Sequence, residues 1–278
     1  MHWASRHVSP EAEQVREETG MGAREQLRAD LGASLVGSGG ALSTADRLCL
    51  ACVELLEVDG AAISLMHDGA TQGTFGSSGE LSRRLDELQF TFGEGPCQDA
   101  VSSGRPVLLG DVDHAGEQRW PAFSRAASES GVHAVFALPV RVARTAVGAL
   151  DLFCTRPGLL SDEGLDGGLW AAELAALPLL DLMTADVDWV AAGEGQDGWE
   201  QLASLERVEV YQATGMLIAQ LDVDAAEALV RLRAHAFAQG VTASEAAWSI
   251  VQRRVELNPD DAWPGRLGRH AGDGGGST

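Results

Sequence analysis

The chain has 278 residues, enough for two ordinary domains that each bury a core. Its formal net charge of −21 disfavours a general affinity for nucleic acid, because phosphates repel an acidic surface. All twenty basic residues are arginines. The lack of lysine excludes the standard forms of a Walker-type phosphate loop, a protein kinase, Schiff-base chemistry and an intact phosphoacceptor receiver domain.

No apolar stretch is long enough to span a bilayer. The longest runs from about Trp170 to Leu182 and is interrupted by Glu173, Pro178 and Asp181. The first residues, MHWASRHVSPEAEQ, lack the apolar core of a secretory signal. We therefore expect no membrane association and a cytoplasmic protein.

The first part of the chain mixes helix and strand signals. Residues 1–41 are charged and then rich in glycine and serine, which favours a disordered or partly helical lead. In residues 42–185, Ser43 with Asp46 is typical of a capping box that begins a helix. After this helix the pattern predicts a hairpin turning at Asp68-Gly69, a helix near Leu81–Leu88, an irregular segment, a helix, a hairpin turning near Ala143–Thr145, and a closing helix that begins at Ser161. This order predicts an α+β domain on an antiparallel sheet with flanking helices.

A second domain is predicted after a break in the pattern. Glycines and acidic residues cluster over residues 186–199, as they do in linkers. Residues 200–257 are purely helical in pattern: the second helix follows Asp224 and ends at Gly240, and Thr242 with Glu245 forms a capping box for the third. We therefore expect an all-α three-helix domain, followed by a disordered tail over residues 258–278.

Residues 206–247 resemble the ANTAR domain of bacterial antitermination regulators. The matching features are Gln212-Ala213, Gly215-Met216-Leu217, the arginine-rich LVRLRAHA segment and the capped third helix. The resemblance implies binding of tandem RNA hairpins in nascent transcripts, which stabilises them against a terminator. It also implies a homodimer that presents two such domains to two hairpins.

Residues 42–185 resemble a GAF domain of the kind found beside ANTAR domains in actinobacterial proteins. The matching stretches are FGEGPC at 92–97, GRPV at 104–107, Trp120-Pro121, and the closing hairpin from Leu138 to Gly148. The resemblance implies a sensor domain with an unidentified small-molecule ligand. A cyclic nucleotide is disfavoured, because the GAF motifs for that ligand include a lysine.

Two arginine pairs are candidate RNA contacts. Arg231 and Arg233 carry planar guanidinium groups suited to bidentate phosphate binding. The alternative is a solvated helix face whose arginines pair with Asp224 or Glu227. Arg253 and Arg254 lie near a helix C-terminus, where the helix dipole alone favours cations.

The segment from Gln212 through Ala213 and Thr214 to Gly215 is the other candidate RNA contact. Its small residues allow close approach of an RNA loop or another backbone. The family often has a lysine where this chain has Thr214, so one phosphate-neutralising charge is missing. Residues 201–257 hold seven acidic residues against five arginines, a net charge of −2, whereas RNA-binding surfaces are usually basic.

In the sensor domain, Cys97, Trp120 and His133 are the candidate ligand contacts. Cys97 is either a sensing thiol or bilin attachment site, or a buried cysteine beside a tight loop. His133, like His114, is of a type that can ligate haem iron, and Trp120 packs against or covers the domain.

The sequence contains no sign of a metal site or of catalysis. Cys49 and Cys52 form a CxxC inside a helical pattern, which favours buried small side chains over a redox pair. No paired metal-ligand spacing and no enzyme motif is present, so we expect neither a metal nor an enzyme.

These predictions combine into a signal-responsive regulator that binds hairpin RNA and controls transcription antitermination. The main alternative is a ligand-sensing protein-interaction or dimerisation module with little RNA affinity, which the missing lysine and the −2 charge favour.

Overall fold

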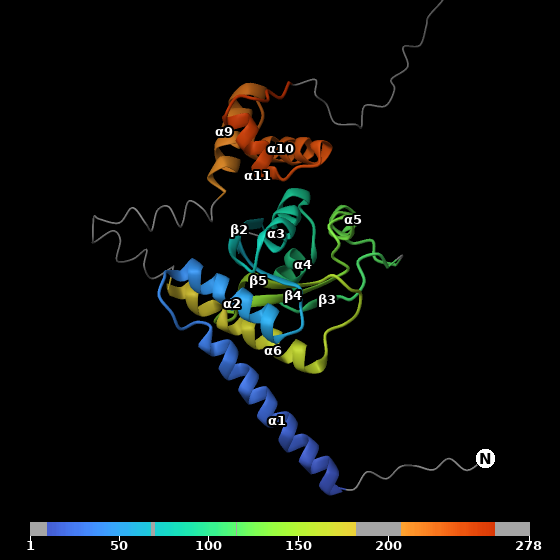
Figure 1. Ribbon diagram of the computed structural model, residues 1–278. Coiled ribbons are helices and arrows are strands. Elements are labelled where there is room, and N and C mark those ends of the chain that lie inside the picture. Colours follow the sequence, from blue (N-terminus) through green and yellow to red (C-terminus); the bar gives the residue numbers. More distant parts are fainter. Residues whose placement is uncertain (1–9, 68–69, 115, 182–206, 259–278) are drawn as a thin grey trace, which may run out of the picture. The chain divides into compact units, whose positions relative to one another are not determined.

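The computed structural model describes residues 10–67, 70–114, 116–181 and 207–258. The chain divides into two compact units, the first ending at Arg207 and the second beginning at Val208 (Figure 1). The predicted linker at 186–199 lies outside the described residues, as does nearly all of the predicted tail at 258–278. No helix within the described ranges is long and apolar enough to cross a membrane.

The first unit is built on a five-stranded antiparallel sheet, which confirms the predicted fold class. The two predicted hairpins form most of it: β1 pairs with β2 and β4 pairs with β5, and β1 also pairs with β5 to join them. The strand order is β2-β1-β5-β4-β3. The strands are β1 (Gly60–His67), β2 (Ala70–Ser77), β3 (Val107–Leu109), β4 (Ala134–Val142) and β5 (Thr145–Cys154).

Helices cover both faces of this sheet (Figure 1). On one side lie α2 (Ala41–Leu55) and α6 (Asp162–Leu174); on the other lie α3 (Glu80–Phe92), α4 (Pro96–Ser103) and α5 (Pro121–Glu129). Successive strand side chains point to opposite faces. Leu150 and Leu152 therefore join the core beneath α2 and α6, whereas Phe153 joins the core beneath α3 and α5. A strand covered on both faces explains the nearly continuous apolar run of β5.

Helix α1 (Pro10–Ala33) occupies much of the predicted lead and packs against α2 and α6. Leu31 is fully buried. The Arg28 guanidinium donates to Asp166 at 3.3 Å and lies 5.2 Å from the centre of the Trp170 ring, whose indole N–H donates to the Arg28 carbonyl at 3.3 Å. The end of α1 is therefore part of the first unit.

Of the two predicted helix starts in the first unit, one is confirmed and one is wrong. Ser161 caps α6 as predicted, accepting a hydrogen bond from the Gly164 N–H at 3.0 Å. The predicted capping box at Ser43 is wrong, because α2 begins earlier with Gly40 at the N-cap and no side-chain cap. Asp46 instead accepts a 2.8 Å hydrogen bond from the Ser77 N–H, so this acid ties α2 to β2.

The second unit contains α9 (Val208–Leu221), α10 (Ala225–Gln239) and α11 (Ala243–Val251), which pack against one another. Asp224 caps α10, and Gly240 ends it with a φ of 68°. Thr242 and Glu245 form the predicted reciprocal capping box at the start of α11. The core is made of small and aliphatic side chains: Val210, Ala213, Leu217, Leu221, Ala228, Leu232, Ala236, Ala243, Ala246, Ala247 and Ile250.

Candidate functional sites

A cluster of buried polar side chains lies between the sheet and helices α3 and α4. Asp151 stands in β5 between Leu150 and Leu152, and because those two point to the other face, its carboxylate faces α3 and α4. Asp86 comes from α3 and Cys97 from the first turn of α4, and all three side chains are fully buried. One donor atom of each lies within 4.8 Å of the donor atoms of the other two.

Neighbouring polar groups hold the Asp86 carboxylate. The Ser64 hydroxyl donates to Oδ1 from β1, and the Thr74 hydroxyl donates to Oδ2 from β2. A guanidinium nitrogen of Arg207, the last residue of the first unit, lies 3.6 Å from Oδ2. Both Asp86 oxygens thus have partners.

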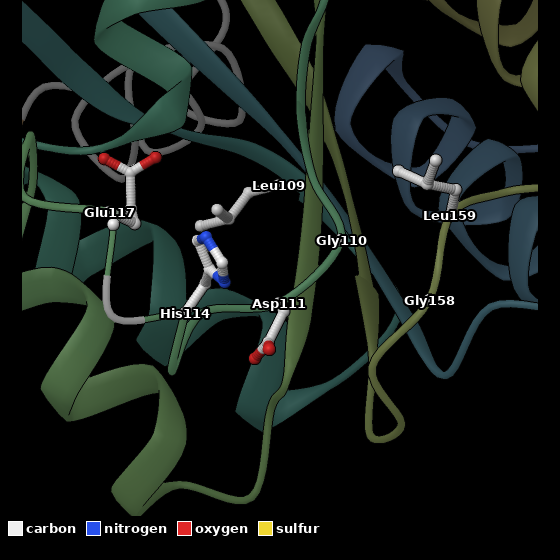
Figure 2. Close-up of a pocket in the computed structure, with 8 residues that line it drawn as sticks. Leu109, Gly110, Asp111, His114, Glu117, Gly158 and Leu159 are labelled. Carbon is white, nitrogen blue, oxygen red and sulfur yellow. The ribbon is translucent and has the colours of Figure 1, made fainter.

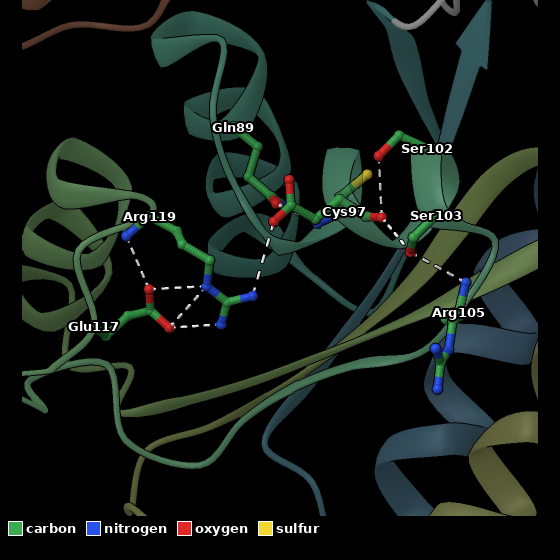
Figure 3. A network of polar contacts seen from close by, with 8 residues as sticks. Gln89, Cys97, Ser102, Ser103, Arg105, Glu117 and Arg119 are labelled. Atoms are coloured by element: carbon green, nitrogen blue, oxygen red, sulfur yellow. Dashed lines mark hydrogen bonds and ion pairs between the residues drawn. The ribbon is translucent and has the colours of Figure 1, made fainter.

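Gln89 links Asp151 to the loop before α4. Its Nε2 donates to Asp151 Oδ2 at 2.6 Å. Its Oε1 accepts from the Cys97 N–H at 2.9 Å (Figure 3). Gly95 makes room for this bridge: it has a φ of 149°, and a Cβ atom there would overlap Gln89 Oε1. The Cys97 sulfur also lies 3.8 Å from Met66 Sδ.

Burial controls the charge state of this cluster. Burial, and then the charge of Asp86, raise the pKa of Asp151 to about 8, against the hydrogen bond from Gln89. Burial also raises the pKa of the Cys97 thiol well above its usual range, and the charges of Asp151 and Asp86 add to the shift. These shifts in pKa make Cys97 a neutral thiol rather than a reactive thiolate.

The two cysteines of α2 are also neutral core side chains. Cys49 and Cys52 are both fully buried. Burial raises the pKa of Cys52 to about 12 and raises that of Cys49 well above its usual range. The CxxC pair therefore has none of the thiolate character that redox activity needs.

The three predicted ligand contacts have separate surroundings. Cys97 belongs to the buried cluster. Trp120 is buried at the start of α5, with the Arg119 guanidinium 4.0 Å from the centre of its ring. His133 Nδ1 lies 3.0 Å from Asp113 Oδ2 near the surface. Trp120 thus packs the core, while His133 makes a polar contact with Asp113 near the surface.

A surface pocket of about 360 Å³ contains His114 (Figure 2). It is lined by Leu109, Gly110, Asp111, His114, Gly116, Glu117, Gly158 and Leu159. Arg119 donates to Glu117 at 2.6 Å, and a second Arg119 nitrogen lies 3.8 Å from Asp99 (Figure 3). Because Glu117 is paired, His114 and Asp111 are the other ionisable groups that this lining offers.

In α9 of the second unit, the predicted RNA segment divides between surface and core. Gln212 and Gly215 are exposed and, being three residues apart, lie on one helix face. A Cβ atom at Gly215 would meet nothing within 4 Å, so the surface above it is open. Ala213 is fully buried, and the Thr214 hydroxyl donates to the Val210 carbonyl at 2.7 Å. Within this segment, Gln212 and Gly215 form the accessible part.

The arginines of the second unit differ in their surroundings. Arg231 donates to Glu227 Oε1 from two nitrogens, at 2.6 and 3.1 Å, which is the ion pair that the sequence offered as an alternative. Arg233 is half-buried and has an interaction of its own. Arg253 and Arg254 are exposed after the end of α11, and Arg253 lines a groove between that end and α9.

Residues 42–167 of the chain match the GAF domain family, and residues 201–251 match the ANTAR domain family. GAF domains sense ligands and ANTAR domains are RNA-binding antitermination domains, so both are regulatory rather than catalytic. Together with the α+β and three-helix architecture, these matches define a two-domain regulatory protein. The chain belongs to the GAF and ANTAR domain-containing proteins.

Solved structures with a similar fold come from varied proteins. A GAF domain of an Acinetobacter phosphoenolpyruvate-protein phosphotransferase is 12% identical, covers 61% of this chain and 98% of its own, and has a TM-score of 0.44. A type II free methionine-R-sulfoxide reductase from Thermoplasma acidophilum is 20% identical, covers 50% and 92%, and has a TM-score of 0.40. No curated protein matches the chain.

Proposed function

We propose that this protein is a signal-responsive regulator that binds tandem RNA hairpins in nascent transcripts and controls transcription antitermination. In this proposal the GAF unit binds a small molecule and the protein acts as a cytoplasmic homodimer. The observation that carries the proposal is the match of residues 201–251 to the ANTAR family, whose members bind RNA.

The surface of α9 supports this proposal. Glycine in a helix interior costs about 1 kcal/mol relative to alanine, so a glycine there calls for a reason outside the helix. No neighbouring atom requires Gly215, since a Cβ atom would meet nothing within 4 Å. Close approach of an RNA backbone beside Gln212 supplies such a reason.

The ion pair of Arg231 is weak enough to be exchanged for RNA. The side chains of Arg231 and Glu227 are 35% and 49% exposed, and exposed pairs four residues apart on a helix contribute only about 0.3–0.5 kcal/mol. A charge-assisted hydrogen bond to phosphate contributes about 1.5–3 kcal/mol. Arg231 can therefore leave Glu227 for a phosphate with a net gain.

The exchange predicts opposite effects for the two partners of this pair. Arg231→Ala should weaken binding of the full-length protein to a tandem-hairpin RNA and reduce the salt slope by about 0.7–0.9. Glu227→Gln should strengthen binding, because it frees Arg231. Gel shifts at low and moderate salt measure both effects.

A matched control exists in the first unit. Arg125 and Glu129 form the same four-residue-spaced pair on α5, with nitrogen and oxygen 2.8 Å apart. Arg125→Ala should leave RNA binding unchanged. If Arg125→Ala and Arg231→Ala lost equal amounts of RNA affinity, the contribution of arginine to RNA binding would not be specific to the second unit. If the tandem hairpins bound no better than an unstructured RNA of equal length, the proposed recognition would be wrong.

Exposed apolar side chains favour a second candidate function, docking or dimerisation through the helical unit. Five large ones lie on the described part of this small unit, at 208–258: Tyr211, Ile218, Val230, Phe237 and Trp248. Exposed apolar patches on soluble proteins commonly mark interaction sites. Sedimentation over a dilution series, with wild type and Trp248→Ala, tests this candidate. A dimer weakened by Trp248→Ala would support it, and a monomer at every concentration would contradict the homodimer.

A further inference from the structure

We propose that Asp86, Cys97 and Asp151 form a binding site for a divalent transition-metal ion, of the class of Zn²⁺, Fe²⁺ and Co²⁺, inside the first unit. Their donor atoms lie within 4.8 Å of one another in a fully buried position. The sequence predicted no metal here, because the three residues lie far apart in the chain and come together only through α3, α4 and β5.

One atom of this cluster specifically requires a further partner. Asp151 Oδ1 is fully buried and has no hydrogen-bond partner among the described residues, whereas Oδ2 of the same carboxylate accepts from Gln89. Buried polar atoms in folded proteins are nearly always satisfied, and an unsatisfied carboxylate oxygen is costly. A cation beside Oδ1 would satisfy it.

Hydrogen bonds from neighbouring residues orient the three metal-ligating side chains, as they do in known protein metal sites. Ligating carboxylates are themselves usually hydrogen-bonded on their outer side. Ser64 and Thr74 provide this for Asp86, whose oxygens keep further lone pairs, and Gln89 provides it for Asp151. Gln89 also fixes the backbone of Cys97, so a single amide positions two of the three ligands.

The donor set and the charges select the kind of ion. Thiolate disfavours Mg²⁺ and Ca²⁺, which prefer oxygen, whereas one sulfur with two carboxylates suits Zn²⁺ or Fe²⁺. Two carboxylates and one thiolate carry three negative charges. A divalent ion together with Arg207, 3.6 Å from Asp86, would balance them.

The geometry needs only small side-chain movements. Donors of a tetrahedral zinc site, with bonds of about 2.0–2.3 Å, lie roughly 3.3–3.7 Å apart. The observed limit of 4.8 Å closes to that range through shifts of about 1 Å. Three protein donors leave a fourth position for water or for a small exogenous ligand, as in metal sites that are not purely structural. The ion would thereby become part of the sensor, whether or not the helical unit binds RNA.

Cobalt uptake by the full-length, chelator-stripped protein tests the site. Because a buried site exchanges slowly, Co²⁺ is supplied both by dialysis and during refolding from denaturant. We expect a single Co²⁺ per chain with a thiolate-to-cobalt charge-transfer band, retained against excess Mg²⁺. Cys97→Ser should abolish the band, and Asp151→Asn should lower the affinity at least about tenfold.

Cys154→Ser is the matched control, because Cys154 is a half-buried cysteine of the same unit outside the cluster; it should leave the band unchanged. Circular dichroism of the metal-free variants checks their folding, and Asp151→Asn remains informative if Cys97→Ser does not fold. Absence of Co²⁺ uptake by either route would overturn the proposal. The proposal would also be overturned if the protein took up Co²⁺ without the charge-transfer band. The same holds if Cys97→Ser and Asp151→Asn took up as much Co²⁺ as the wild type, because the ion would then lie elsewhere.

Discussion

Replacing Asp151 with asparagine should stabilise the metal-free first unit, and by more as the pH rises. Burial raises the pKa of Asp151 from its ordinary 3.8 to about 8. Between these values the folded protein holds a proton that the unfolded chain has released, so wild-type stability falls as the pH rises. Each pH unit costs up to about 1.4 kcal/mol, hence up to about 4 kcal/mol between about pH 5 and about pH 8.

Asparagine removes this pH dependence and keeps the local hydrogen bond. Its amide oxygen can accept from Gln89 as Asp151 Oδ2 does, and its amide nitrogen can donate toward Asp86. Asp86 and Cys97 remain the ionisable neighbours in both proteins. The difference in unfolding free energy between variant and wild type therefore isolates the charge on Asp151.

Urea denaturation of both proteins in chelator, at about pH 5 and about pH 8, measures this difference. Asp59→Asn is the control, because hydrogen bonds from the N–H and hydroxyl of Thr155 lower the pKa of Asp59. The stabilisation that Asp59 provides is complete above about pH 4 and is lost as the pH falls further. The difference in unfolding free energy between Asp59→Asn and the wild type should therefore be the same at about pH 5 and about pH 8. A difference for Asp151→Asn that is equal at both pH values would refute the reasoning.

Three further substitutions test the fold and the helical surface. Gly95→Ala should destabilise the first unit by about 1–3 kcal/mol in urea denaturation. The new methyl group would displace the Gln89 side chain, and alanine is strained at the Gly95 φ of 149°. Thr242→Ala removes the capping box of α11 and should cost about 1 kcal/mol, seen as earlier melting of the helical unit. Gly215→Ala should raise helix stability by about 1 kcal/mol while weakening binding to tandem-hairpin RNA; unchanged RNA affinity would remove Gly215 from the proposed contact surface.

Local sequence signals predicted the fold well where a structural feature depends on neighbouring residues. Thr242 and Ser161 act as caps because a hydroxyl three residues before an N–H is a self-contained arrangement. Ser43 with Asp46 has nearly the same local pattern, yet Asp46 bonds to Ser77 on another element. No local rule distinguishes a capping acid from one that makes a tertiary contact.

The buried cluster was only partly predictable for the same reason. Cys97 stood out because it follows a glycine-rich turn, but its partners Asp86 and Asp151 lie in separate elements. The available signal was the acid within the apolar run of β5. A strand covered on both faces has no solvent side for a carboxylate, so Asp151 had to be buried.

The acidic character of the chain is compatible with RNA recognition, because electrostatic repulsion acts only over a short distance at physiological salt. Repulsion between RNA and distant acidic residues is screened beyond about 8–10 Å at physiological salt, whereas a phosphate touching Arg231 or Arg253 interacts at contact distance. With a net charge of −21, the chain lacks the sequence-independent attraction that basic proteins have for any nucleic acid. In the proposed function, affinity for RNA then depends on arginines such as Arg231 and Arg253 and on the shape of the surface around Gly215. The proposed function therefore predicts that this protein discriminates among RNAs by the geometry of the contact, because it has little non-specific attraction to RNA.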